Sequence, residues 1–153
     1  MKPWVLSISL ALCLGLPSFG LGQSADPRIG AWRLVRMSVE SRTQPAGTSN
    51  WIYSQEGSEL RVDIHSVSPA GRAMHWSFQT KRDGAEVRVR GNPAVDRVVV
   101  TRRNEWIDEI VYKKAGLAHA IGTSEISVDG QTMTLTLKNA SGGVAVGVYK
   151  KVQ

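Results

Sequence analysis

Residues 58–90 read SELRVDIHSVSPAGRAMHWSFQTKRDGAEVRVR, and this stretch decides the fold class. Apolar and polar residues alternate along three segments, which are separated by Pro69-Ala70-Gly71 and by Asp83-Gly84. Alternation interrupted by short turn signals predicts antiparallel β-strands that are joined by tight hairpins. We therefore expect residues 58–90 to form a three-stranded meander.

The two turns also predict how the strands of this meander pair. A three-residue loop at Pro69-Ala70-Gly71 places Val62 opposite Phe78. A type I′ turn at Asp83-Gly84 places Phe78 opposite Val89. Both registers bring apolar side chains to one face, whereas a slip of one residue would send them to the other face.

The opposite face of the meander is polar. Its members are Arg61, Asp63, His65, His75, Arg88 and Arg90. The histidines face each other near a carboxylate, which are residue types that bind metals, but two histidines are fewer ligands than a metal site needs. We expect this face to meet solvent. If it points inward instead, it lines a polar cavity suited to an anionic ligand or to catalysis.

The same alternation continues through the rest of the chain. Strands are predicted at 31–39, 50–55, 58–67, 72–81, 85–90, 97–103, 105–113, 118–128, 131–138 and 143–152, and a loop or short lid at 40–49. Many short strands with turns between them are typical of a β-sandwich or β-barrel. We predict an all-β fold, a single antiparallel up-and-down β-barrel of 8–10 strands.

Two details refine the strand prediction. In the first strand the apolar phase changes after Leu34, because Val35 and Met37 fall on the face opposite Leu34, so we expect a β-bulge there. Near the other end of the chain, Asp129-Gly130 is a second type I′ turn signal, which pairs Ile126 with Met133.

Residues 1–22 have the pattern of a secretory signal peptide. Lys2 precedes an apolar run and a stretch of mostly small residues that ends at Gly22. The run from Val5 to Leu16 is shorter than the roughly 17 residues that a membrane-spanning helix needs. We expect a leader at 1–22, one domain at 23–153, and export to the periplasm or the extracellular space.

Composition limits the classes of partner. Cys13 is the single cysteine of the chain and belongs to the leader, so the domain is expected to have no disulfide. The net charge of +6 is spread along the chain without a basic–aromatic motif, which argues against nucleic-acid binding. We expect a monomer with at most weak attraction to anionic surfaces.

The two ends of the predicted domain resemble the calycin superfamily, which contains the lipocalins, the fatty-acid-binding proteins and lipocalin-like secreted proteins of bacteria. Gly30-Ala31-Trp32 resembles the G-x-W opening of the first lipocalin strand, and Gly147-Val148-Tyr149-Lys150 resembles the last strand of fatty-acid-binding proteins. The resemblance implies that Trp32 closes one end of a barrel beneath a ligand cavity.

The resemblance also has departures. Fatty-acid-binding proteins carry R-x-Y in the last strand to hold a ligand carboxylate, but here the matching residues are Gly147 and Tyr149. That carboxylate site is therefore not carried over. The arginine that stacks on the lipocalin tryptophan has no clear equivalent, and Lys150 or Lys151 can replace it by a cation–π contact.

The aromatic residues are candidates for the interior of the barrel. We expect these side chains to form the hydrophobic core, and some of them to line a pocket for a small apolar or amphipathic molecule as well. They are Trp32, Trp51, Tyr53, Trp76, Phe78 and Tyr149. Trp51 and Tyr53 follow the 40–49 loop directly, so we expect them at the mouth of the barrel.

Catalytic patterns are absent from the sequence. It has no nucleophile elbow, no metal-ligand spacing and no phosphate loop, and we predict neither an enzyme nor a cofactor. Asp108 and Glu109 are interpreted as solvated strand charge. We predict an exported, non-catalytic barrel that binds a small ligand. The alternatives are an interaction or inhibitor module with a filled barrel and an enzyme or anion-binding protein with a polar cavity.

Overall fold

The computed structural model describes residues 25–40, 42–43 and 47–152. The predicted leader at 1–22 lies outside the described residues. No helix occurs in the described part of the chain, so none there is long and apolar enough to cross a membrane.

Strands occupy most of the described chain. They are β1 (Gly30–Val39), β2 (Arg42–Thr43), β3 (Thr48–Glu56), β4 (Glu59–Val67), β5 (Ala73–Thr80), β6 (Asp83–Arg88), β7 (Arg97–Arg102), β8 (Ile107–Lys114), β9 (Leu117–Ile126), β10 (Thr132–Asn139) and β11 (Val144–Val152). Each predicted strand corresponds to one of these within a few residues. The two-residue strand β2 lies inside the predicted 40–49 loop.

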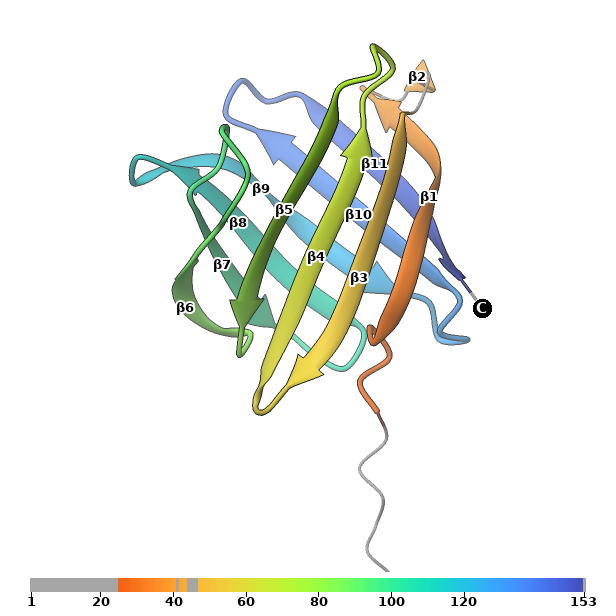
Figure 1. Ribbon diagram of the computed structural model, residues 1–153, viewed down its shortest axis with the longest axis vertical. Helices are drawn as coiled ribbons and strands as arrows, with labels where there is room; N and C mark the ends of the chain where they lie inside the picture. The colour runs from red at the N-terminus through yellow and green to blue at the C-terminus, as the bar shows by residue number, and fades with distance from the viewer. Residues whose placement is uncertain (1–24, 41, 44–46, 153) are drawn as a thin grey trace, which may run out of the picture.

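All strands belong to one antiparallel sheet that curls into a nearly closed barrel (Figure 1). The order is β5-β4-β3-β1-β11-β10-β9-β8-β7-β6. Apart from the two-residue β2, which lies between β1 and β3 in the chain, neighbours in the sheet are neighbours in the chain except where β1 meets β11. β2 pairs with β1 alone. The prediction of a single antiparallel up-and-down barrel is confirmed.

Two of the predicted hairpin registers are confirmed. Val62 pairs with Phe78 across β4 and β5, and Ile126 pairs with Met133 across β9 and β10. The first of these hairpins turns at Gly71, whose φ of 78° is a left-handed conformation that glycine adopts without a steric penalty.

The predicted bulge in the first strand is also present. The register between β1 and β11 shifts between Leu34 and Arg36, which leaves Val35 as the extra residue. Val35 is 54% exposed, whereas Leu34 and Met37 are both half-buried. The bulge thus lets the strand present apolar side chains to the interior on both sides of the phase change.

The hairpin predicted at Asp83-Gly84 forms only in part. An isolated bridge, Ser77–Arg90, has the predicted register, but no continuous ladder joins β5 to β6, and β6 pairs with β7. A type I′ turn needs positive φ at both central residues, but here the positive values are at Arg82 (58°) and Gly84 (85°). The turn is therefore not of type I′, and β6 diverges from β5 (Figure 1).

Candidate functional site

The interior of the barrel is built around a cluster of aromatic rings. Trp51 lies at its centre, with ring centroids 6.1 Å from Trp76 and 5.9 Å from Tyr149, both in edge-on contact. Tyr112 meets the ring of Trp76 at 5.8 Å, also edge-on. Such contacts between rings are favourable beyond the apolar area that they bury.

All six predicted aromatic residues lie in the barrel interior. The buried core contains Trp32, Trp51, Tyr53, Trp76, Phe78 and Tyr149. Trp51 and Tyr53 are only 4% and 6% exposed and occupy the middle of β3, so the expectation that they form the mouth is wrong. Whether any of the six contacts a ligand stays a prediction.

The mouth lies instead at the end of the barrel where β1 and β3 connect. A cavity of about 460 Å³ opens there. Its apolar lining comes from Leu34 and Met37 of β1, Val67 of β4 and Met74 of β5, and Tyr149 of β11 forms part of its wall. Tyr149 also contacts Trp51, so the cavity borders the aromatic core directly.

Below this mouth the barrel is nearly filled. The space among Tyr53, Phe78 and Ser124 measures about 10 Å³, which is too small for an organic ligand. The side chains of Trp51, Val62 and neighbouring core residues fill the remainder. A small molecule therefore fits the mouth cavity and not the deep interior.

Trp32 is fully buried and fills the opposite end of the barrel, where a cavity of about 680 Å³ also opens next to Asp26, Leu60 and Arg82. The Trp32 indole N–H donates a hydrogen bond to the Arg28 carbonyl oxygen at 2.8 Å. The Lys151 ammonium lies 5.1 Å from the centre of the Trp32 ring and donates to the Pro27 carbonyl oxygen at 3.0 Å. Lys151 is thus the residue that makes the cation–π contact; Lys150 bonds to the Thr132 hydroxyl on the surface instead.

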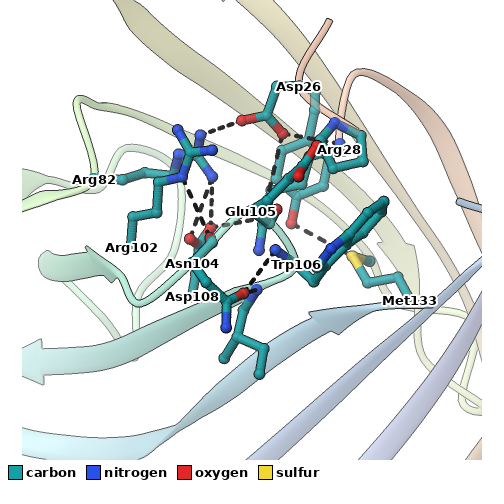
Figure 2. Close-up of polar contacts among 12 residues, drawn as sticks. Asp26, Arg28, Arg82, Arg102, Asn104, Glu105, Trp106, Asp108 and Met133 are labelled. Atoms are coloured by element: carbon teal, nitrogen blue, oxygen red, sulfur yellow. Dashed lines mark hydrogen bonds and ion pairs between the residues drawn. The ribbon is translucent and has the colours of Figure 1, made fainter. Parts of the chain in front are cut away.

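A buried network of charges reinforces this end of the barrel (Figure 2). Arg28 is 0% exposed, and its Nε lies 2.7 Å from Asp108 Oδ2. Arg82 Nη1 donates to both Asp108 oxygens at 3.2 and 3.3 Å, and Arg82 also pairs with Asp26. Arg28 Nη1 donates to the Glu105 carbonyl oxygen at 2.9 Å.

Burial shifts the pKa values within the network. Desolvation lowers the pKa of Arg28 and raises the pKa of Asp108, while the attraction between the opposite charges acts in the other direction. Desolvation dominates because water is almost entirely excluded from both groups. The network therefore holds its charges through mutual pairing rather than hydration.

The sequence interpretation missed this network. Asp108 was expected to be solvated, but it is 3% exposed, and only Glu109 faces outward, where it pairs with Arg103. The signal was present in the alternation, because Asp108 shares the inward phase of Ile110 and Tyr112. No comparable signal marks Arg28, which precedes the first strand.

The predicted polar face of the meander points outward, so the inward alternative is wrong for these residues. Asp63 accepts hydrogen bonds from Arg61 Nε at 2.6 Å and contacts His75 Nε2 at 3.3 Å. The bond from Arg61 is the main cause that lowers the pKa of Asp63. The rings of His65 and His75 stack with centroids 4.2 Å apart.

Within residues 25–40, 42–43 and 47–152, no group of three or more His, Cys, Asp or Glu side chains is placed to hold a metal ion. The members of the polar face that remain, Arg88 and Arg90, line a separate cavity next to β5.

Comparison with known proteins shows the class of fold. No protein-family model matches the chain, and no curated protein matches its sequence. Among solved structures, a variant of the fluorescent protein UnaG matches with a TM-score of 0.57 at 18% identity, over 84% of this chain and 98% of that one. The fatty acid binding protein of Schistosoma mansoni in complex with arachidonic acid matches with a TM-score of 0.56 at 15% identity, over the same shares of the two chains.

A redesigned β-barrel also matches, with a TM-score of 0.52 at 13% identity, over 83% of this chain and 93% of that one. At these identities the likeness shows the fold alone. The chain therefore has the same fold as these proteins, a nearly closed antiparallel β-barrel, in agreement with the fold that the ends of its sequence implied.

Proposed function

We propose that the protein binds a small apolar or amphipathic molecule in the mouth cavity and performs no chemistry on it. The observation that carries this proposal is the cavity of about 460 Å³ lined by Leu34, Met37, Met74 and Tyr149. Ligand sites are typically concave, mostly apolar and roughly 300–1,000 Å³ in volume. The likeness to a barrel solved with arachidonic acid supports the same class of ligand.

The position of the cavity limits how the ligand lies. Because the interior below it is filled, the ligand occupies the mouth and rests against the ring of Tyr149. Ser49 and Ser66 line the same cavity, and their hydroxyl groups provide polar contacts for one end of an amphipathic molecule. The buried aromatic rings act as a rigid floor rather than as a binding chamber.

Titration with the neutral fluorescent probe N-phenyl-1-naphthylamine tests this proposal. Met37→Trp fills the cavity from β1 and is expected to weaken probe binding about tenfold or more, since it excludes the probe sterically. Ile52→Trp adds the same ring on the exposed outer face of β3 and serves as the matched control. Equal binding by the two variants, or no binding by the wild-type protein, would contradict a ligand site in the mouth.

The filled interior favours one other function. A barrel whose core leaves only about 10 Å³ among Tyr53, Phe78 and Ser124 suits an interaction module whose surface contacts another protein. Native mass spectrometry of protein purified from its own host separates the two functions. A co-purifying small molecule supports the ligand carrier, whereas a clean apo mass together with no probe binding supports the interaction module.

Export and a monomeric state complete the proposal. Residues 1–22 support export, because their composition matches a cleavable leader. N-terminal sequencing of the protein from culture medium or periplasm should begin at Gln23, and size-exclusion chromatography should give the mass of one chain. Protein that keeps Met1 in the cytoplasm would contradict the leader.

A further inference from the structure

The barrel has one seam, where β5 and β6 separate. Ser77 and Arg90 exchange both backbone hydrogen bonds there, each 2.9 Å long. In an antiparallel ladder the next such pair would be Gln79 with Arg88, but these two residues form no bridge. Arg88 pairs with Arg97 of β7, but because the neighbouring Val89 N–H donates to Asp96 on that side, the Arg88 N–H points away from β7. The N–H groups of Arg88 and Gln79 therefore both face the seam.

A cavity of about 240 Å³ occupies this seam. On its inner side it is lined by two apolar residues. Phe78 belongs to the buried core, and Val87 is partly buried and packs against that core. On its outer side stand Arg61, Arg88 and Arg90. The seam thus combines an apolar floor with a basic rim.

The basic rim is only partly neutralised by its surroundings. Glu59 is the one carboxylate in the lining of the cavity, against three arginines. Arg61 is already engaged by Asp63 at 2.6 Å. Across residues 25–40, 42–43 and 47–152, the side chains of Arg88 and Arg90 have neither an ion-pair partner nor a hydrogen-bond partner, and both residues are exposed.

We infer that this seam is a second binding site, for a small molecule that joins an oxyanion to a short apolar group. Arg88 and Arg90 hold the oxyanion, because guanidinium groups match the geometry of carboxylate and phosphate oxygens. The N–H of Gln79 adds a backbone donor from the open strand edge. The apolar group rests on Phe78 and Val87, and the volume of the cavity limits it to about one ring.

This site is independent of the proposed ligand in the mouth. The mouth cavity is lined by residues of β1, β3, β4, β5 and β11, and it shares no lining residue with the seam cavity. The seam also differs in charge, because three arginines surround it and only Arg72 lines the mouth. Either site can therefore fail its test without affecting the other.

Amide NMR spectra recorded during titration test the inference. The probes are phenyl phosphate and benzoate, which separate phosphate from carboxylate, together with inorganic phosphate and uncharged benzyl alcohol. We expect one or both aromatic anions to give saturable shifts at the amides of Ser77, Gln79 and Arg88. Inorganic phosphate should bind more weakly, since it lacks the apolar group, and benzyl alcohol should give no saturable shift.

Paired variants provide the control. Arg88→Gln with Arg90→Gln should weaken binding about tenfold or more, because charge-assisted hydrogen bonds are lost. Arg33→Gln with Arg36→Gln removes the same charge from exposed positions of β1 and should change binding less than about twofold. Both double variants should still bind the neutral probe in the mouth.

Three outcomes would overturn the inference. The first is no saturable shift with any anion, and the second is equal weakening by the two double variants, which would indicate a general basic surface. The third is a shift at Gln79 and Arg88 caused only by an aspartate-rich octapeptide. That result would show that the open edges accept a strand of another polypeptide instead of a small molecule.

Discussion

Arg28 and Asp108 form a 2.7 Å ion pair at the Trp32 end of the barrel, where both side chains are almost fully buried. The pair joins the segment before β1 to the start of β8. Together with Arg82 and Asp26 it balances two positive and two negative charges within one buried cluster. This end is therefore held by charge pairing as well as by the Trp32 ring.

The cost of breaking this pair is the first prediction. Asp108→Asn keeps the shape of the side chain but removes the nearer of the two carboxylates that pair with the buried Arg28, which costs about 3–5 kcal/mol of unfolding free energy. Urea denaturation measures the change. Glu109→Gln, on the solvent side of the same strand, is the control and should cost far less, because its ion pair with Arg103 is exposed to water. Equal stability of the two variants would show that the buried pair gives no net stabilisation.

The second prediction concerns the lysine over Trp32. Lys151→Gln removes both the cation–π contact and the charged hydrogen bond to the Pro27 carbonyl, so a loss of about 1–2 kcal/mol is expected. Lys150→Gln carries the same charge change on an exposed neighbour and should lose less than about 0.5 kcal/mol. Trp fluorescence during urea unfolding follows both. If both variants lose the same unfolding free energy, the effect comes from the change in net charge and not from the contacts of Lys151.

The third prediction is the alkaline titration of the tyrosines. The chain has three, Tyr53, Tyr112 and Tyr149, and burial raises the pKa of each phenol above its ordinary value of 10.0. The folded state thus keeps these protons where the unfolded state loses them, so stability is complete below about pH 10 and falls as the pH rises further. Phenolate absorbance at 295 nm should appear only together with loss of the near-ultraviolet circular dichroism. A phenol that ionises near pH 10 in the folded protein would contradict its burial.

The fourth prediction concerns the position where fatty-acid-binding proteins carry arginine. A Cβ added to Gly147 would lie 2.9 Å from the Tyr149 ring and 3.4 Å from Leu34 Cδ1. Tyr149 therefore occupies the space that a longer side chain needs, and Gly147→Ala should cost about 1–3 kcal/mol by overpacking. Urea denaturation checks this cost. An alanine variant of unchanged stability would indicate that the Tyr149 ring moves aside freely.

The local patterns of the sequence predicted most of the fold. The alternation of residues 58–80 and the turn at Pro69-Ala70-Gly71 depend on neighbouring residues alone, so the pairing of Val62 with Phe78 followed directly. The bulge at Val35 was likewise visible as a change of phase. The ring of Trp32 at one end of the barrel followed from a resemblance rather than from the pattern itself.

The tertiary structure decided what these patterns left open. The apolar phase of 73–89 is compatible with a β5–β6 ladder, yet β6 pairs with β7, and Arg82 turns into the barrel to meet Asp26 and Asp108. The sequence alone thus determined the strands and most hairpins. Only the closure of the sheet decided where the seam and the mouth lie and which buried charges pair. Each of these features depends on contacts between residues far apart in the chain.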